Sequence, residues 1–249
     1  MVQVQVGHVT FHGFADEGFV LSPDGFVGWE NAPSSRRTDT PRPGGHGSFR
    51  TPVFKNGRLV TLSGTVLASD ERQLVAFADD LAGISYGERR MVVSTETGVR
   101  WADVTGEGEP KFDRIGGALE ASFQIQFFAA DPRKYGELRE FVSTGSDVTA
   151  WHRGNFPASP IFEVTGFTSG YRIVGPGGTF TVPGLKASAT VDRIDFSTGL
   201  FTRNGAPAVR AATQVRMWDV PPGANVSWRV EPLSSGTGTA RMFLTDTWI

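Results

Sequence analysis

The sequence contains no cysteine, which excludes disulfide bonds, thiolate metal sites and a cysteine nucleophile. A chain without cysteine suits folding in a reducing cytosol, although this does not show where the protein acts. An excess of one charge is also lacking. The net charge of −2 provides no global basic field for nucleic acid or an anionic membrane. No stretch approaches the ~18 apolar residues of a membrane span, and the start lacks a signal-peptide pattern, so we expect no membrane insertion.

Residues that carry chemistry are scarce. The four histidines include His8 and His12, which lie in a segment whose alternation predicts a strand. Four residues apart on a strand they would be separated by more than ~10 Å, so we do not expect a metal pair. The glycines at 175–178 lack the lysine and hydroxyl of a phosphate-binding loop and predict a hairpin turn. We therefore expect no catalytic residue, no cofactor and no metal site, and hence no enzyme.

Asp192 and Asp195 are the candidates that the sequence offers for a catalytic carboxylate pair. Glycoside hydrolysis needs two carboxyls about 5–9 Å apart and a raised pKa on one of them. The two aspartates fall where a strand is expected to turn, which favours hydrogen bonds that cap the turn. Calcium binding at this turn is the alternative.

The composition favours short strands and tight turns. The chain has 31 glycines and 15 prolines, and its 19 phenylalanines against three tyrosines indicate aromatic core filling. The clearest strand is 119–128, in which apolar residues alternate with Glu120, Ser122, Gln124 and Gln126. One face is therefore buried, and the other meets solvent, a neighbouring subunit or a channel lumen. The strand ends at the turn 131–132.

The first half also predicts a helix over about 69–82. Ser69 is the expected N-cap, Leu74 belongs to one apolar stripe, and Gly83 is the expected C-terminal stop. Strands are expected at 2–11, at 58–67, and at 91–93 with 99–104, the last two joined as a hairpin.

The second half predicts a separate β domain. Small polar residues at 143–149 are typical of a linker, which divides the chain into domains at 1–145 and 150–249. Eight short strands in the second domain suggest a sandwich or a jelly roll. They are expected at 161–165, 171–174, 179–182, 187–192, 199–203, 215–220, 226–230 and 240–248.

Two groups of residues are candidate binding surfaces. Arg36, Arg37, Arg42 and Arg50 form the one local basic patch, in a loop rich in proline and glycine. Asp39 interrupts the patch and few aromatic residues interleave, so an interface or solvated loop is favoured over phosphate contact. A carbohydrate-binding module is the alternative function, because exposed indoles stack on sugars, although core packing explains them equally well. The candidate sugar-stacking residues are Trp151, Trp218 and Trp228.

Over nearly its whole length the chain resembles the distal tail protein family of long-tailed, siphovirus-type bacteriophages, also described as phage tail family proteins. The resemblance rests on the order of several weak motifs. They are the Arg-Pro-Gly loop at 41–50, RLVTLSGTVLASDERQLVAFADDLAG, FFAADPRKYG, GNFPASPIFEVTG, VDRIDFSTGLFTRNG, PPGANVSW and the ending DTWI.

The resemblance implies a mainly β protein. It implies an N-terminal, ring-forming, β-sandwich-like domain with one helix, followed by a galectin-like β-sandwich. It also implies a hexameric ring at the tail tip that joins the tail tube to the host-recognition apparatus, with DNA passing through the lumen. The galectin sugar-binding residues are not evident, because His152 is the only histidine in the second half.

The leading hypothesis is therefore a structural virion protein, a baseplate hub made in the host cytoplasm and located at the tail tip. Its expected partners are itself, the major tail tube protein, the tape measure protein and the tip or receptor-binding proteins. A permanent ring needs heterologous contacts that close, which β domains provide by pairing edges and burying apolar faces. We place Arg36, Arg37, Arg42, Arg50, Glu120, Gln124 and Gln126 as candidates for an interface or lumen face.

Overall fold

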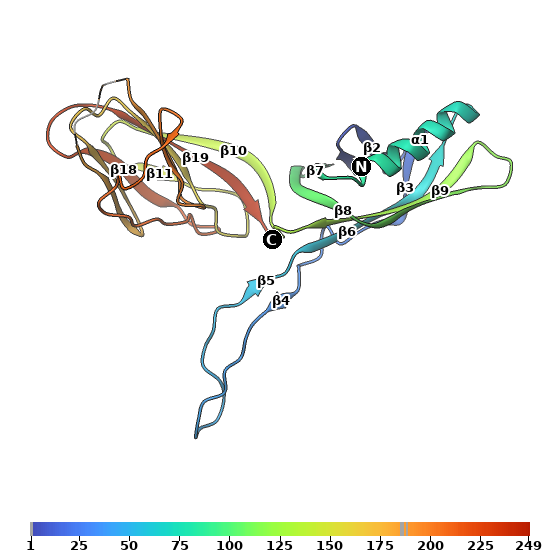
Figure 1. Cartoon of the computed structure of the whole chain (residues 1–249), viewed down its shortest axis with the longest axis horizontal. Helices are drawn as coiled ribbons and strands as arrows, with labels where there is room; N and C mark the ends of the chain where they lie inside the picture. The colour runs from blue at the N-terminus through green and yellow to red at the C-terminus, as the bar shows by residue number, and fades with distance from the viewer. Residues whose placement is uncertain (1, 185–186, 188) are drawn as a thin grey trace. The chain divides into compact units, whose positions relative to one another are not determined.

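A computed structural model describes residues 2–184, 187 and 189–249 (Figure 1). It is mainly β with one helix among these residues, as the sequence predicts. The chain divides into two compact units, the first comprising the residues up to Lys134 together with Ile249, and the second spanning Tyr135–Trp248. The sequence placed the division between 145 and 150.

The first unit is a sheet that closes on itself. Its strands follow the order β8-β7-β1-β2-β3-β6-β9, and β9 pairs again with β8. All of these pairs are antiparallel except β2 with β3. The elements are β1 (Gln3–Val6), β2 (Val9–His12), β3 (Gly18–Val27), β4 (Ser35–Arg36), β5 (Phe54–Lys55), β6 (Arg58–Leu67), α1 (Glu71–Ile84), β7 (Glu88–Thr95), β8 (Gly98–Arg114) and β9 (Glu120–Ala129).

The length of β8 makes the closure possible. Its first part pairs with β7, from Gly98 to Thr105, and its second part pairs with β9, from Thr105 to Arg114. A closed sheet satisfies the backbone hydrogen bonds of its strands without leaving a free edge. In this unit each of the two parts of β8 is held by a different neighbouring strand.

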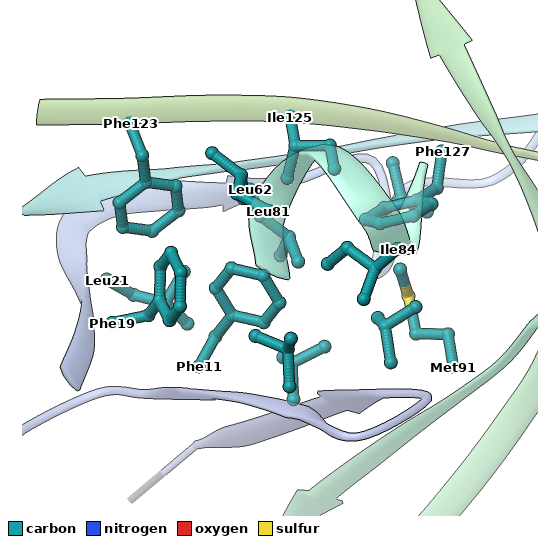
Figure 2. Close-up of a cluster of buried hydrophobic side chains, with 14 of the residues drawn as sticks. Phe11, Phe19, Leu21, Leu62, Leu81, Ile84, Met91, Phe123, Ile125 and Phe127 are labelled. Atoms are coloured by element: carbon teal, nitrogen blue, oxygen red, sulfur yellow. The ribbon is translucent and has the colours of Figure 1, made fainter. Parts of the chain in front are cut away.

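The alternating residues of the strands fill the core of the first unit. Figure 2 shows Phe123, Ile125 and Phe127 of β9 pointing toward Phe11 and Phe19. The rings of Phe19 and Phe123 meet edge to face, with centroids 5.3 Å apart. The helix adds three buried side chains to the same core, Leu74, Leu81 and Ile84.

The helix was predicted in the right place, but its ends differ. Asp70, not Ser69, is the N-cap, and its carboxylate accepts a 2.8 Å hydrogen bond from the backbone N–H of Gln73. Gly83 does not end the helix. Ile84 is buried in the core and extends the helix by a residue, and the Ser85 hydroxyl then donates to the carbonyl of Ala82.

The strand predictions for the first unit are mostly confirmed. The strand 58–67 is β6, the strand 119–128 is β9 shifted by one residue, and β7 and β8 form the expected hairpin. The single strand predicted at 2–11 is wrong. Gly7, at φ +60°, turns the chain there, and β1 and β2 pair with each other.

The second unit is a two-sheet sandwich. One sheet follows the order β17-β16-β15-β12-β19-β10, and the other follows β11-β18-β13-β14. The strands are β10 (Lys134–Ser143, whose first residue belongs to the first unit), β11 (Val148–Ala150), β12 (Ile161–Thr165), β13 (Tyr171–Gly175), β14 (Gly178–Val182), β15 (Val191–Asp195), β16 (Phe201–Arg203), β17 (Ala206–Pro207), β18 (Val226–Pro232) and β19 (Thr239–Trp248).

Aromatic residues from both sheets form the core of the sandwich. Phe162 of β12 lies 5.2 Å from Trp228 of β18, measured between ring centroids, and 4.9 Å from Phe196. Ile173 and Val230 of the smaller sheet are fully buried in the same cluster. The sandwich predicted for this half is therefore confirmed.

Three predictions for this half are wrong. The segment 143–149 is not a linker, because Ser143 is buried and its hydroxyl accepts a hydrogen bond from the backbone N–H of Val230. The segment 215–220 forms only an isolated bridge, between Val220 and Ala158. The strand predicted at 187–192 begins at Val191, and residues 188 and 185–186 lie outside the described part.

Candidate functional site

The most exposed element of the first unit is a hairpin arm, residues 33–56, which connects β3 to β6 (Figure 1). β4 and β5 pair at its base, and Pro41 and Ser48 form a bridge near its tip. Every residue at 34–50 is exposed. The arm is therefore held together by its own hydrogen bonds rather than by a core.

The four arginines predicted as a basic patch all lie on this arm. Arg37 is paired with Asp39 at 2.8 Å, and Arg42 lies over the ring of Phe49 at 5.8 Å. Arg36 and Arg37 line a hollow of about 370 Å³ together with Phe54 and its neighbours. The arm thus combines exposed cations with exposed apolar side chains, which is a composition suited to a protein interface.

A buried cation anchors the root of the arm. The guanidinium of Arg58, only 3% exposed, donates to the carbonyls of Gly28 at 2.9 Å and Trp29 at 2.8 Å. It also donates to the carbonyl of Pro132, at 3.2 and 3.1 Å. Burial lowers the pKa of Arg58, and the negative charge of Glu30 acts in the opposite direction. The two chain segments that carry the arm are therefore fixed to each other.

The predicted polar face of β9 points outward. Glu120 and Ser122 are exposed and Gln124 and Gln126 are partly exposed, whereas the alternate residues are buried. Gln126 donates to the hydroxyl of Thr61 on β6 at 3.3 Å. This face of β9 is thus directed away from the core.

Carboxylates collect beside the polar face of β9. Lys111 and Asp113 of β8 pair with Gln124 and Ser122, and Glu107 pairs with Gln126. A hollow of about 400 Å³ is lined by Glu109, Lys111, Gln124 and Gln126. We call Glu107, Glu109, Asp113 and Glu120 the acidic face. All four are exposed and none forms an ion pair within the described residues.

The sugar-stacking prediction is wrong for two of the three tryptophans. Trp228 is 1% exposed and Trp218 is 7% exposed, and both pack in the sandwich core against Phe162. Trp151 is 41% exposed, but one ring face is covered by the guanidinium of Arg139 at 4.1 Å. An aromatic platform for sugars is therefore not assembled from these residues.

The second unit has an apolar hollow elsewhere. Its volume is about 300 Å³ and its walls come from β16, β17 and the segment that follows them. Leu200 and Val215 stand exposed at this hollow. Arg210 is its only charged lining residue.

Asp192 and Asp195 do not form a catalytic pair. Asp192 is buried, accepts from both Nε and Nη2 of Arg203 at 2.7 and 3.1 Å, and accepts from the Tyr171 hydroxyl at 2.9 Å. Burial and the charge of Asp192 raise the pKa of Tyr171 well above its ordinary value. Turn capping was thus wrong for Asp192. It is confirmed for Asp195, which accepts from the backbone N–H of Ser197 at 2.8 Å.

A second buried carboxylate is satisfied in the same way. Asp246 accepts from the backbone N–H of Arg153 at 2.8 Å and from Nε of Arg139 at 3.2 Å. Burial alone would raise the pKa of Asp246, but these hydrogen bonds outweigh it and hold the pKa below its ordinary value. Fully paired buried charges of this kind support a fold, and neither carboxylate is available to a substrate.

The histidines do not converge. His8 lies in the β1–β2 turn, with Nε2 3.1 Å from a carboxylate oxygen of Asp80, whereas His12 is on β2. His152 is buried, and its Nδ1 accepts from the backbone N–H of Gly154 at 3.0 Å. No cluster of three metal-ligating side chains occurs within residues 2–184, 187 and 189–249. No helix in that part is both long and apolar enough to cross a membrane.

The exposed polar groups of the first unit lie on the arm and on outer strand faces, and Asp192 and Asp246 are buried and paired. The fold has counterparts among solved structures. The Dit protein of phage SPP1, described as a paradigm of the hub adsorption apparatus in phages that infect Gram-positive bacteria, matches with a TM-score of 0.76. The match has 13% sequence identity and covers 100% of both chains. The chain therefore has the fold of a phage distal tail protein along its whole length.

Two structures of the phage P2 baseplate in its activated conformation are more distant. The calcium form matches with a TM-score of 0.49 and 9% identity, over 99% of this chain and 98% of that chain. The strontium form matches with a TM-score of 0.38 and 10% identity, over 97% and 98%. No family model and no curated protein sequence matches the chain.

Sequence reasoning found the arginine arm and the polar face of β9, but missed the acidic face. Its carboxylates come from β8 and β9, and the antiparallel pairing of these two consecutive strands puts them side by side. Alternation along 107–113 is broken by a register shift between Glu107 and Lys111, so the usual strand signal is absent there.

Proposed function

We propose that this chain is a structural protein of a phage tail tip, a baseplate hub that links the tail tube to the host-recognition apparatus. The observation that carries the proposal is the match to the SPP1 Dit protein, which covers both units of the chain rather than one common β module. A β-sandwich alone occurs in many unrelated proteins. A closed sheet with a helix followed by a sandwich is a far more restrictive arrangement.

The working form of the hub is a homo-hexameric ring with DNA passing through its lumen. Rings arise from heterologous contacts that close, and permanent ones bury about 2,000 Å² or more at each interface. The exposed arm and the outward face of β9 supply surface for such contacts. A near-neutral chain, with net charge −2, suits a channel that DNA must cross without sticking.

The partners follow from this position in the virion. The ring contacts the major tail tube protein and the tape measure protein on one side and the tip or receptor-binding proteins on the other. The protein is made in the host cytoplasm and acts in the tail tip of the virion. It works without catalysis, cofactor or sequence-specific binding of nucleic acid.

Electron microscopy of phage tails tests the proposal directly. Tails labelled with an antibody against this chain should carry the label at the distal end only. Label along the whole tail, or at the capsid junction, would contradict the proposed position. In parallel, native mass spectrometry of the purified chain and of dissociated tail tips should detect an assembly of six copies of the 26.9 kDa chain.

A further inference from the structure

The apolar hollow of the second unit lies against the core of the sandwich. Phe180, which is 3% exposed, and Phe201 belong to its lining, and their rings meet edge to face with centroids 6.2 Å apart. The small residues Gly199, Ala208 and Ala212 line it as well. Its volume of about 300 Å³ lies at the lower end of the range for ligand pockets and can admit an apolar side chain.

Large apolar side chains stand exposed around this hollow. Val209 exposes 83% of its surface and Leu200 exposes 55%. Val215 and Met217 expose 50% and 41%. A single exposed apolar residue is ordinary, whereas a contiguous patch marks an interaction site. These four residues line one hollow, so they form a patch.

A turn with an unusual backbone carries two of the lining residues. The backbone N–H of Ala211 donates to the carbonyl of Ala208 at 3.4 Å, which closes a turn with Val209 and Arg210 at its centre. Arg210 has φ +58°, a conformation that residues with a side chain rarely adopt and that glycine usually provides. Such strain collects at functional sites. The turn thus holds an exposed valine and an arginine at the hollow.

The segment around the hollow carries positive charge only. Residues 197–217 include no aspartate and no glutamate. Of their three arginines, Arg203 is paired with the buried Asp192. Arg210 and Arg216 have no ion pair among the residues that the structure describes. A partner that covers the hollow should therefore bring a carboxylate beside its apolar group.

The strand edges beside the hollow are poor templates for an added strand. β17 is the outermost strand of its sheet, and its Pro207 has no N–H to donate. Along β14, the backbone N–H of Thr181 donates to the carbonyl of Gln214 at 2.8 Å, and the N–H of Thr213 donates to the carbonyl of Thr181 at 3.0 Å. A partner is therefore recognised here through side chains.

We propose that this hollow binds a short acidic, apolar segment of another protein. An apolar side chain of that segment enters the hollow against Phe180, and a nearby carboxylate pairs with the guanidinium of Arg210. The flanking residues of the segment cover Val209 and Leu200, which a ligand confined to the hollow would leave exposed. The site goes beyond the proposed tail-tip position, because its chemistry does not depend on a ring.

The methionines provide a way to observe binding in the full chain. Among the four methionines, Met217 lines the hollow, whereas Met91 and Met242 are fully buried in the two cores. The chain is labelled with carbon-13 at its methionine methyl groups, and Met217→Leu assigns the signal of Met217 in NMR spectra. The probe is the peptide Glu-Ser-Leu-Phe-Ser-Glu with blocked ends. It should shift the Met217 signal to saturation and leave the Met91 and Met242 signals in place.

Two matched peptides separate charge from apolar contact. One carries lysine in place of both glutamates, and the other carries serine in place of leucine and phenylalanine. Each should bind at least about tenfold more weakly, because each lacks one of the two contacts. Equal affinity for the acidic and basic peptides would overturn the recognition of a carboxylate. Absence of a saturable Met217 shift with the acidic peptide would overturn the site itself.

Charge reversal at the turn gives the reciprocal test. Arg210→Glu should weaken binding of the acidic peptide at least about tenfold and make the lysine peptide the tighter ligand. Loss of folding could not produce this exchange of preference. The matched control Arg72→Glu changes the net charge equally at an exposed position of α1 and should keep the preference for the acidic peptide. If Arg210→Glu also keeps that preference, the pairing with Arg210 is wrong.

Other occupants of the hollow would give different results. If native mass spectrometry shows that Arg210→Glu loses an assembly that Arg72→Glu retains, a second copy of this chain fills the hollow and the proposal is wrong. If sodium decanoate shifts the Met217 signal at lower concentration than the acidic peptide does, the hollow is a site for small amphipathic anions instead. Label away from the tail end would overturn the proposed function and leave these titrations unaffected, so the two proposals fail separately.

Discussion

Replacing Arg58 by methionine tests how the arm is anchored. The side chain is buried where both segments of the arm meet the sheet. Its nitrogens donate to the carbonyls of Gly28, Trp29 and Asn31 before the arm and of Pro132 after β9. Methionine fills a similar volume but donates to none of them. The substitution therefore removes the hydrogen bonds while leaving most of the packing.

The cost follows from the carbonyls left without a donor. The Trp29 carbonyl keeps a 3.0 Å hydrogen bond from Lys134, so the carbonyls of Gly28, Asn31 and Pro132 are the three that lose the donor described here without a replacement. An unsatisfied buried polar group costs about 1–3 kcal/mol, and removing a buried cation returns part of this by ending its desolvation. We expect the free energy of unfolding of the first unit to fall by about 3 kcal/mol. Arg58→Lys keeps the charge without the guanidinium fork and should cost about half as much.

Amide hydrogen exchange followed by mass spectrometry gives a readout for each unit. A loss of ~3 kcal/mol accelerates exchange through unfolding about a hundredfold, since 1.4 kcal/mol corresponds to tenfold. The acceleration should appear in β6, whereas β12 of the second unit serves as the internal reference. Trypsin should also cleave the arm faster. If β6 exchange accelerates less than about threefold, the Arg58 contacts do not anchor the arm.

Three further changes probe the two cores. Leu74→Asp buries an unpaired charge and should destabilise the first unit by about 3–5 kcal/mol. The control Val75→Asp, at a position that is 43% exposed, should leave the melting temperature nearly unchanged, and equal effects of the two variants would contradict the orientation of the helix. Tyr171→Phe removes one hydrogen bond to Asp192, and the free energy of unfolding of the second unit, measured in urea, should fall by about 1–2 kcal/mol. An unchanged free energy of unfolding would mean that solvent replaces the bond. Burial lowers the pKa of His152, although the charge of Asp246 acts in the opposite direction, so the unfolded state binds the proton more readily than the folded state. The second unit should therefore lose stability as the pH falls below about 6.5. His152→Gln should flatten this pH dependence, and an unchanged slope would exclude His152 as its source.

Strands with one buried face were predictable from sequence. In β6 and β9 every second residue enters the core, so the period of two is written in the residues themselves. The helix was predictable for a similar reason, because Leu74 and Leu81 lie on one stripe. Its ends were less so, since Ser69 and Asp70 are both good caps and only the geometry selects between them.

Elements whose neighbours come from distant parts of the chain were not predictable. β10 has few buried residues and no clear alternation, and it was missed. Asp192 was assigned to a turn because its partners, Tyr171 and Arg203, are chosen by sheet pairing rather than by local sequence. The tryptophans were ambiguous for the same reason, because burial of Trp218 against Gly175 and Gly177 depends on how the sandwich closes.

The closure of the first sheet changes how this unit can assemble. β domains commonly associate by pairing free strand edges and by burying apolar faces, and the sequence led us to expect both modes here. β8 pairs with β7 from Gly98 to Thr105 and with β9 from Thr105 to Arg114, so the sheet closes through successive stretches of one strand. The arm is the hydrogen-bonded element that leaves the closed sheet, and Arg58 fixes the direction in which it starts. We expect side chains on the arm and on the outer faces of the strands to contribute to assembly through this unit. The polar face of β9 lies beside the acidic face, and together they form one exposed polar surface on the paired strands β8 and β9.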